Sequence, residues 1–400
     1  MHSALQGRNI LFGVTGSIAV FKAAYWVREL VKEEARVTVM MTESAAQFVT
    51  PLTFAALSGN RVYTEMFADR EEDLMAHIAL SEDADAVLIA PATAQTIARL
   101  AHGMADNLVS AAVLAAAAPV VVCPAMNSRM LVHPATRKNT ATLQEFGYTV
   151  VESECGLLAC SETGAGRLPE WDTVREILAG LFAENDLTGE HILITAGPTR
   201  EPLDPARYLS NRSSGKMGYA LARTAKRRGA EVTLISGPVN LPAPPGISVV
   251  PVQTAAEMAA AVQEHAVSAS IIVKAAAVAD FRSKHLSALK IKKFAAEPLV
   301  ELIANPDILA TLGSSRQPGQ LLVGFAAESN NHEAEGRRKL QAKNVDLMVV
   351  NDILGKDTGF DAETNQVTLI TRNGTEQLAL LSKEETANRI WDKVIALRRA

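Results

Sequence analysis

The sequence predicts an α/β fold of two Rossmann-like domains with mainly parallel sheets, and three observations support this prediction. The order strand, loop, helix, strand occurs twice, over residues 9–42 and again over residues 191–237. Each occurrence is followed by short apolar runs that alternate with helical patterns. The chain has 400 residues, which is enough for two or three domains. Strands that alternate with helices are typical of parallel sheets connected by right-handed crossovers.

Further strands of the first half are predicted by its apolar runs. These runs are ADAVLIAP, APVVVCP and YTVVES, at residues 84–91, 118–124 and 148–153. A helical pattern extends through residues 94–117, AQTIARLAHGMADNLVSAAVLAAA, and predicts helix across that stretch.

The second half contains five such runs, and a polar segment separates the two halves. The runs are ISVVPV, ASIIVKAAA, QLLVGFAAE, VDLMVVN and NQVTLIT. The segment AENDLTGE, residues 183–190, lacks apolar periodicity and follows the last helical pattern of the first half. We therefore expect one domain over residues 1–186 and another over residues 187–400.

The composition is that of a globular protein and argues against several classes of partner. Hydrophobic residues make up 48% of the chain and charged residues 21%, with a formal net charge of −5. This charge gives no basic footprint for nucleic acid or for an acidic membrane surface. No apolar run is long enough to span a membrane, and the first residues lack the pattern of a signal peptide. With three cysteines a disulfide framework is not expected, so we predict a cytoplasmic protein.

The segment PAMNSRM, residues 124–130, directly follows a predicted buried strand. Ligands bind at the carboxyl ends of strands in open α/β sheets, so binding chemistry is expected here. The amide of Asn127 offers two donors and an acceptor, and the thioethers of Met126 and Met130 offer soft packing surface. Ordinary turn chemistry would also explain a Pro-x-x-Asn sequence after a strand.

A glycine-containing turn between the first predicted strand and helix suits a phosphate group. Gly13, Gly16 and Ser17 lie where backbone amides and the helix dipole would favour an anion. The spacing is not G-x-G-x-x-G, so a single phosphate, as in FMN or a mononucleotide, is favoured over a pyrophosphate. Glycine in such a turn also has a purely steric explanation. Small polar residues end the later strand at Pro91 and suit a flavin edge or a phosphate.

Two further features of the first half have reactive side chains. His77 precedes a predicted strand, where a single histidine is more often structural than catalytic. Residues 156–170, GLLACSETGAGRLPE, surround Cys160 with glycines and a proline, which predicts a mobile flap that carries a thiol. Cys123 and Cys155 lie beside apolar or strand-like segments, and we interpret them as structural.

In the second half, a long loop and a strand end carry the candidate chemistry. The loop includes Ser213 and Ser214 before a helix start at Gly215, but Met217 excludes the P-loop pattern. Helix-terminal amides and the two serines would still suit a phosphate. The strand IIVK continues through AAAVA to an acid, and the cluster KIKK follows at residues 290–293. A solvated surface would explain these lysines, as would triphosphate and metal binding.

The motifs TGSIAVFK, AHIAL, IAPATAQTIARLAHGMADNL, PAMNSRM and GLLACSETGAGRLPE together resemble the flavin-dependent cysteine decarboxylases. More narrowly, the whole chain resembles the bacterial bifunctional phosphopantothenoylcysteine decarboxylase/phosphopantothenate–cysteine ligases of coenzyme A biosynthesis. The resemblance implies a flavodoxin-like, flavin-binding first half and a nucleotide-binding second half. One position departs from the family motif, which usually continues with an aromatic residue where Leu131 follows Met130.

For the first half, the resemblance implies a decarboxylase site of His77, Asn127 and Cys160. FMN would take a hydride from the thiol-bearing carbon, and the resulting thioaldehyde would permit loss of CO₂. Asn127 would bind the substrate carboxylate, Cys160 would supply the proton of the final reduction, and His77 would orient or deprotonate the thiol. The residues expected to bind FMN are Gly16, Ser17, Ile18, Thr42, Ser44, Pro91, Thr93 and Met126.

For the second half, the resemblance implies that CTP activates 4′-phosphopantothenate as an acyl-cytidylate, from which cysteine displaces CMP. Asn211 would act on the acyl-cytidylate, Lys290 on the triphosphate, and Arg207 in phosphopantothenate turnover. A divalent ion such as Mg²⁺ would shield the triphosphate, with ligands that the sequence leaves unknown. The residues expected to bind the nucleotide are Ala275, Ala276, Ala277, Asp280, Asn305, Pro306, Asp307, Ile308, Phe325, Lys339 and Lys343.

The resemblance also implies partners, and three other functions remain open on the residues alone. The expected partners are 4′-phosphopantothenate, cysteine, CTP and phosphopantothenoylcysteine. We expect a homo-oligomer with trimeric decarboxylase contacts and dimeric ligase contacts, together a dodecamer. The alternatives are a monofunctional decarboxylase with a non-catalytic nucleotide-binding domain, a nucleotide-dependent dehydrogenase, and a flavin-binding relative without catalysis.

Overall fold

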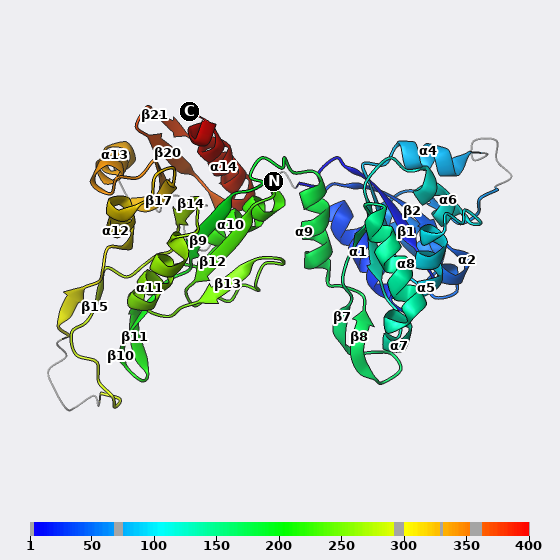
Figure 1. Ribbon diagram of the computed structural model, residues 1–400, viewed down its shortest axis with the longest axis horizontal. Coiled ribbons are helices and arrows are strands. Elements are labelled where there is room, and N and C mark those ends of the chain that lie inside the picture. Colours follow the sequence, from blue (N-terminus) through cyan, green and yellow to red (C-terminus); the bar gives the residue numbers. More distant parts are fainter. Residues whose placement is uncertain (1–3, 68–74, 292–299, 329–330, 353–361, 400) are drawn as a thin grey trace. The chain divides into compact units, whose positions relative to one another are not determined.

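A computed structural model describes residues 4–67, 75–291, 300–328, 331–352 and 362–399 of the protein (Figure 1). The chain divides into two compact units between Phe182 and Ala183. This division lies at the start of the polar segment 183–190, where the sequence loses its apolar periodicity. Among the described residues, no helix has the length and apolar character needed to cross a membrane.

The first unit is built on a parallel sheet of six strands in the order β3-β2-β1-β4-β5-β6. Apolar runs predicted all of these strands except the short β3. Strand order reverses direction between β1 and β4, so the loops after these strands diverge at the carboxyl edge. The strands are β1 (Asn9–Val14), β2 (Arg36–Met41), β3 (Val62–Tyr63), β4 (Ala86–Ala92), β5 (Val120–Pro124) and β6 (Thr149–Val150).

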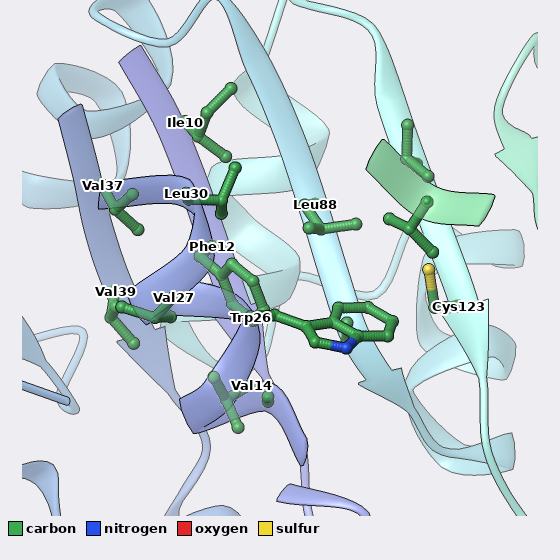
Figure 2. Close-up of a cluster of buried hydrophobic side chains, with 14 of the residues drawn as sticks. Ile10, Phe12, Val14, Trp26, Val27, Leu30, Val37, Val39, Leu88 and Cys123 are labelled. Atoms are coloured by element: carbon green, nitrogen blue, oxygen red, sulfur yellow. The ribbon is translucent and has the colours of Figure 1, made fainter. Parts of the chain in front are cut away.

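Helices cover both faces of this sheet, because alternate side chains of each strand point to opposite sides. One core lies under α1, α3 and α9, where Phe12, Leu88 and Cys123 gather around Trp26 (Figure 2). The other core lies under α4, α5, α6 and α8. The helices are α1 (Val20–Lys32), α2 (Glu43–Ala46), α3 (Pro51–Ser58), α4 (Ala76–Glu82), α5 (Ala94–Ala101), α6 (Leu108–Ala115), α7 (Ser128–Val132), α8 (Pro134–Glu145) and α9 (Trp171–Leu181).

The helical pattern over residues 94–117 does not form one uninterrupted helix. Helix α5 ends at Ala101, and Gly103 follows with a φ of 65°, a left-handed conformation that glycine adopts without strain. Helix α6 begins at Leu108, where the side chain of Asn107 accepts a hydrogen bond of 3.0 Å from the backbone of Ser110. The prediction of continuous helix was therefore wrong between these caps.

The second unit contains a sheet of eight strands in the order β13-β12-β9-β14-β17-β18-β20-β21. The first six strands are parallel, and the last two are antiparallel at one edge, so the predicted mainly parallel sheet is confirmed. The strands are β9 (His191–Ala196), β12 (Glu231–Ser236), β13 (Ser248–Pro251), β14 (Ile271–Lys274), β17 (Leu321–Glu328), β18 (Leu347–Asp352), β20 (Val367–Thr371) and β21 (Gly374–Gln377).

Helices also cover both faces of the second sheet. One face packs against α10 and α14, and the other against α11, α12 and α13. Trp391 of α14 is fully buried, and its indole nitrogen donates to Leu221 O at 3.1 Å and Thr224 Oγ1 at 3.0 Å. The helices are α10 (Lys216–Arg227), α11 (Ala255–Ala266), α12 (Ile308–Ser315), α13 (His332–Ala342) and α14 (Lys383–Arg399).

Several short antiparallel pairs were not predicted from the sequence. In the loop after β9, β10 and β11 form a hairpin, and β15 lies beside them in Figure 1. Pro202 lies within β10 next to a register shift, and proline argues against a strand when the sequence is read alone. The additional strands are β7 (Glu154–Leu157), β8 (Thr163–Arg167), β10 (Arg200–Asp204), β11 (Arg207–Ser210), β15 (Phe281–Ser283), β16 (Leu302–Ala304), β19 (Thr364–Asn365) and β22 (Leu381–Ser382).

Replacing Trp391 tests the packing of α14 on α10. We expect Trp391→Ala to lower the free energy of unfolding of the second unit by about 3–5 kcal/mol, the range for truncating a buried aromatic side chain. Trp391→Phe keeps most of the packing and loses the indole donor, which predicts a loss of roughly 1–3 kcal/mol. Urea unfolding followed by circular dichroism measures both. Val267→Ala, at a side chain that is 68% exposed, is the control. An equal effect of all three substitutions would contradict the assignment of Trp391 as a core anchor.

Candidate functional site

A pocket of about 620 Å³ lies in the first unit, between the loops after β1 and β5 and the β7–β8 hairpin. Its walls combine an apolar surface with a small number of polar groups, as is typical of cofactor sites. Residues at the start of α1 form one wall, and the hairpin forms another. The lining residues include Ser17, Ile18, Phe21, Lys22, Met126, Asn127, Leu157, Cys160 and Arg167.

Asn127 and Cys160 meet on the wall of this pocket, although 33 residues separate them in the sequence. The amide nitrogen of Asn127 lies 3.4 Å from Cys160 Sγ and 3.4 Å from Glu162 Oε2. The amide oxygen accepts a hydrogen bond of 2.9 Å from the backbone of Arg129 and so caps α7. The two interpretations of PAMNSRM are therefore compatible, because the oxygen makes the turn and the nitrogen faces the pocket.

The base of the β7–β8 hairpin is fixed to the loop that carries Asn127. Met126 N donates to Gly166 O at 3.0 Å, and Ser128 Oγ donates to Ala165 O at 2.6 Å. A Cβ atom at Gly166 would lie 2.1 Å from Met126 O, so only glycine permits this approach. The segment predicted as a flap is thus a hairpin with a docked base, and Cys160 lies near its tip.

The glycine turn after β1 approaches α2 closely. A Cβ atom at Gly16 would lie 2.5 Å from Ser44 Cβ, which gives this glycine a steric reason. The hydroxyl of Thr42 accepts a hydrogen bond of 3.2 Å from Ala45 N and caps α2. Of the residues expected to bind FMN in this region, Ser17 and Ile18 line the pocket, whereas Thr42 and Ser44 are not among its lining residues.

Pro91 and Thr93 connect the end of β4 to the turn after β1. The hydroxyl of Thr15 donates to Pro91 O at 2.7 Å and accepts from Thr93 N at 3.0 Å. The hydroxyl of Thr93 in turn caps α5 by accepting from Thr96 N at 3.2 Å. These bonds fix the two loops that diverge at the switch in strand order, although neither Pro91 nor Thr93 lines the pocket.

His77 lies apart from Asn127 and Cys160. It belongs to the first turn of α4, at the opposite end of the first unit from the β7–β8 hairpin (Figure 1). It is not among the residues that line the pocket. Its Nδ1 atom is buried and has no hydrogen-bond partner among the described residues. The structure of one chain therefore does not assemble the predicted set of three.

Leu131, which departs from the family motif, lies outside the pocket, and Cys155, which we predicted to be structural, is exposed. Leu131 is a half-buried residue of α7, and its backbone amide donates to Asn127 O at 3.0 Å. Cys123 is buried on β5, where burial raises the pKa of its thiol far above the ordinary value. The thiol of Cys155 is exposed on β7, so the structure gives it no core role.

In the second unit, the loop of residues 275–280 follows β14 at the carboxyl edge of the sheet. Two of the predicted site residues hold its backbone. Asn211 donates from Nδ2 to Val278 O at 3.0 Å, and Asn305 donates from Nδ2 to Ala279 O at 2.8 Å. The backbone of Asn305 also donates to Asp280 O at 2.8 Å. The structure thus brings Asn211, Asn305 and the 275–280 loop together.

Two threonines that the sequence reading missed support the same loop. Thr195 Oγ1 accepts from Ala276 N at 3.1 Å, and Thr199 Oγ1 accepts from Ala279 N at 3.0 Å. Both threonines are buried. Their position at the carboxyl end of the central strand β9 is the signal that would have identified them.

Asp204, which the sequence patterns did not point to, joins Arg207 to Ile291, the residue after Lys290. Asp204 Oδ2 accepts from Arg207 Nη2 at 2.5 Å and from Ile291 N at 3.1 Å. Arg207 Nη2 also donates to Ile291 O at 2.9 Å. The hydrogen bond from Arg207 holds the pKa of Asp204 far below its ordinary value. Lys290 is exposed next to Ile291, whereas Lys292 and Lys293 of the predicted cluster lie outside the described residues.

The other residues expected to bind the nucleotide lie on both faces of the sheet edge. Asp307 caps α12 by accepting from Ala310 N at 2.9 Å and pairs with Lys343. Burial opposes ionisation of Asp307, but Lys343 and Ala310 outweigh it and leave its pKa below the ordinary value. Pro306 and Ile308 line a pocket of about 340 Å³ beside α11 and α12. Lys339 is half-buried on α13.

Phe325 packs with the core on the α10–α14 side, as does Ala275 of the 275–280 loop. The predicted phosphate loop also begins on that side, where Gly215 has a φ of 77° and Lys216 pairs with Glu363. Ser213 Oγ accepts from Gly215 N at 3.3 Å. Within the described ranges there is no cluster of three or more histidine, cysteine or acidic side chains that would hold a metal ion.

Comparison with known proteins gives both halves a family. Residues 2–183 match the family model described as "Flavoprotein", and residues 187–397 match the "DNA/pantothenate metabolism flavoprotein C-terminal domain". A protein of Bacillus subtilis (strain 168) named "Coenzyme A biosynthesis bifunctional protein CoaBC" is 45% identical over 398 residues, which are 98% of each chain. The protein of that name from Haemophilus influenzae is 43% identical over 98% of each chain.

This chain belongs to the CoaBC family. A solved structure of the C-terminal domain of a CoaBC protein is 41% identical to this chain, covers 54% of it and 98% of that domain, and has a TM-score of 0.47. The pocket with Asn127 and Cys160 falls within the flavoprotein match, and the 275–280 loop falls within the C-terminal match. The two candidate sites therefore lie in separate units.

Replacing Asp204 tests the network that joins Arg207 to the segment of Lys290. The carboxylate of Asp204 accepts hydrogen bonds from the backbone amides of Ala206, Arg207 and Ile291. We expect Asp204→Asn to speed hydrogen exchange at these three amides, because each loses a charged acceptor. Since the folded pKa of Asp204 is below the unfolded value, its stabilising effect is complete above pH 3.8 and is lost as pH falls further. The difference from wild type should therefore be constant from pH 7 to about 5 and shrink in stronger acid.

Glu264→Gln, on the exposed face of α11, is the control for this substitution. It should leave exchange in residues 203–210 unchanged. Equal exchange in Asp204→Asn and wild type at pH 7 would show that this carboxylate does not hold the segment.

Proposed function

We propose that the chain catalyses two consecutive steps of coenzyme A biosynthesis. Residues 187–400 use CTP to join cysteine to 4′-phosphopantothenate through an acyl-cytidylate. Residues 1–186 then use FMN to decarboxylate phosphopantothenoylcysteine to 4′-phosphopantetheine and CO₂. The observation that carries the proposal is the contact between Asn127 and Cys160 on the wall of one pocket, in a chain that aligns over 98% of its length with CoaBC proteins.

The residues of the first pocket fit a flavin. Apolar side chains of Ile18, Phe21 and Met126 offer surface for a planar ring, and the backbone of Ser17 lies at the start of the 13-residue helix α1. The bound flavin would supply a two-electron oxidation at the thiol-bearing carbon of the substrate, followed by the reverse reduction. The pocket also includes Lys22 and Arg167, whose positive charges suit an anionic substrate.

Asn127 and Cys160 have separate tasks in this proposal. The amide nitrogen of Asn127 faces the pocket and donates to the substrate carboxylate, while its oxygen is held by the cap of α7. The thiol of Cys160 lies 3.4 Å from that nitrogen and supplies the proton that completes the saturated product. Because both side chains touch the same pocket, carboxylate binding and proton delivery occur at one substrate.

His77 enters the proposal through a second copy of the chain. Within one chain it lies away from the pocket, while Phe21 and Tyr25 of α1 are 62% and 54% exposed beside the pocket wall. An exposed apolar surface of this kind is typical of a subunit interface. We propose trimeric contacts between decarboxylase halves, with His77 of one chain at the pocket of another. Dimeric contacts between ligase halves would then complete a dodecamer.

In the ligase half, the proposal places the nucleotide on the 275–280 loop. Asn211 contacts the acyl-cytidylate, Lys290 the triphosphate, and Arg207 the phosphopantothenate, with the remaining predicted residues around the nucleotide. Mg²⁺ would arrive on the nucleotide phosphates, since this ion retains water and substrate oxygens as ligands. That mode of binding does not require a cluster of protein ligands, and the described residues contain none.

The assay that tests the proposal uses the full chain with CTP, cysteine and 4′-phosphopantothenate. Pyrophosphate release that requires all three substrates supports the ligase half, and a yellow protein that releases CO₂ supports the decarboxylase half. A yellow protein that never releases pyrophosphate would leave the monofunctional decarboxylase in its place. A colourless protein that reduces a nicotinamide cofactor would replace the proposal by a dehydrogenase.

Replacing Cys160 tests proton delivery. We expect Cys160→Ser to release CO₂ but to accumulate the oxidised enethiol product, because oxidation and decarboxylation precede the step that needs the thiol proton. Mass spectrometry of the product and CO₂ release measure the two steps. Cys155→Ser, at an exposed thiol outside the pocket, is the matched control and should yield saturated product. Saturated product from Cys160→Ser at the wild-type rate would remove the thiol from the mechanism.

Replacing Asn211 tests the ligase site. Asn211→Asp removes the donor to Val278 O and puts a negative charge beside a carbonyl oxygen. We expect acyl-cytidylate turnover to fall on the order of a hundredfold, as for loss of one positioned donor, while decarboxylation of supplied phosphopantothenoylcysteine stays unchanged. Rapid-quench detection of the acyl-cytidylate measures the effect. Asn373→Asp, in the turn between β20 and β21, is the control. Wild-type ligase turnover in Asn211→Asp would exclude the assigned role.

A further inference from the structure

Lys274 is a charged residue at the end of a buried central strand. Its strand, β14, has the sequence IIVK, and the three preceding residues are buried. Lys274 pairs in register with Thr195 of β9 and Gly324 of β17, so sheet flanks it on both sides. Like Ile272, two residues earlier, it points to the α11–α12 face. The next residue begins the 275–280 loop.

Three charged groups act on the ammonium of Lys274. They are the carboxylates of Asp307 and Asp280 and the ammonium of Lys343. Burial lowers the pKa of Lys274 from 10.5 to about 8, an effect that the two carboxylates oppose and Lys343 reinforces. Among the described residues, Lys274 has no hydrogen-bond or ion-pair partner. Lys274 is half-buried, so a partly desolvated charge without a partner lies where a ligand can still reach it, and we infer that its partner arrives with that ligand.

The neighbouring charges are not equally available to a ligand. Asp307 and Lys343 are committed to each other, and Asp307 also caps α12. Asp280 is exposed and negative. An anionic nucleotide that approaches this edge therefore meets one unneutralised carboxylate, and Lys274 is the positive charge that remains to offset it. Without Lys274, the remaining groups, Asp280, Asp307 and Lys343, would together have a net negative charge.

We propose that Lys274 is a further nucleotide-binding residue of the ligase half, whose uncommitted ammonium beside Asp280 and Asp307 donates to oxygen atoms of the nucleoside triphosphate. The inference rests on the proposed CTP-dependent ligase function. It deepens that function by adding a cation from the sheet itself to those expected from Lys290, Lys339 and Lys343. A structural role for Lys274, as a counter-ion to the two aspartates alone, predicts different behaviour.

Calorimetric titration of the full chain with CTP, with Mg²⁺ present, measures the first consequence. We expect Lys274→Met to weaken CTP binding about tenfold, the order of effect for removing one close charge partner. Maximal ligase turnover at saturating CTP should change by less than about twofold, since uniform binding lowers KM without changing kcat. Lys274→Arg should retain most of the affinity at neutral pH. Lys393→Met, at an exposed ion pair on α14, is the matched control.

Proton uptake gives a second readout that a structural role would not alter. A bound polyanion favours the charged ammonium, so CTP binding at about pH 8.5 should draw a proton to Lys274. Titrations in two buffers with different ionisation enthalpies measure that proton. We expect uptake in wild type and Lys393→Met, and much less in Lys274→Met and Lys274→Arg. The affinity of wild type should also fall as pH rises above 8, while that of Lys274→Arg stays constant.

Thermal unfolding without nucleotide separates binding from folding. Below pH 8 the folded protein carries a charge that burial disfavours, so Lys274→Met should melt at the same or a higher temperature than wild type. A lower melting temperature together with weaker binding would overturn the proposal in favour of a structural role. Wild-type affinity and proton uptake in Lys274→Met would overturn it directly. If wild type neither binds CTP nor releases pyrophosphate, the ligase function fails, and this inference fails with it.

Discussion

Both units depend on the same constraint, which is that a parallel sheet covered by helices on both faces leaves polar chemistry only at its ends. The strands β1, β4 and β5 are almost entirely buried, as are β9 and β14, so their side chains form the cores. Polar groups accumulate where these strands end. In the first unit the strand order reverses between β1 and β4, and in the second between β9 and β14. The pocket with Asn127 and Cys160 and the 275–280 loop lie at these carboxyl edges.

This constraint explains what could be predicted from the sequence. Continuous apolar runs identify buried strands without knowledge of their partners, so most strands of both sheets were predicted. Asn127 follows such a run and could be placed at a strand end. The β10–β11 hairpin could not, because its strands are short, β11 is largely exposed, and Pro202 argues against a strand. Asp204 could not be predicted either, because its role depends on hydrogen bonds to Arg207 and to Ile291, which is distant in the sequence.

Other parts of the site depend on distances that no local pattern contains. The meeting of Asn127 and Cys160 requires Gly164 and Gly166, whose missing side chains let β8 rest on the loop after β5. For His77 the sequence has the opposite limitation. A family motif identifies the residue, but it does not say whether the residue lies at the pocket of its own chain or at that of another copy. Phe325 likewise belongs to the predicted nucleotide-binding set with Lys343, but it packs on the α10–α14 face, whereas Lys343 follows α13 on the other face. A family motif can therefore predict that a residue belongs to a site without predicting where that residue lies in the folded chain.

The cations at the two sheet edges have different electrostatic surroundings. In the first unit, Lys22 and Arg167 both approach Glu170, at 3.0 Å and 3.7 Å, so the cations beside the pocket are held by a shared carboxylate. Such exposed pairs contribute little to stability and remain available to a substrate. In the described part of the second unit, Lys274 has no comparable partner, and its partial burial makes the charge costly until a ligand arrives. A site of the second kind couples ligand binding to protonation, because the ligand restores a charge that burial disfavours. Nucleotide affinity in this protein should therefore respond to pH through the sheet as well as through its surface lysines.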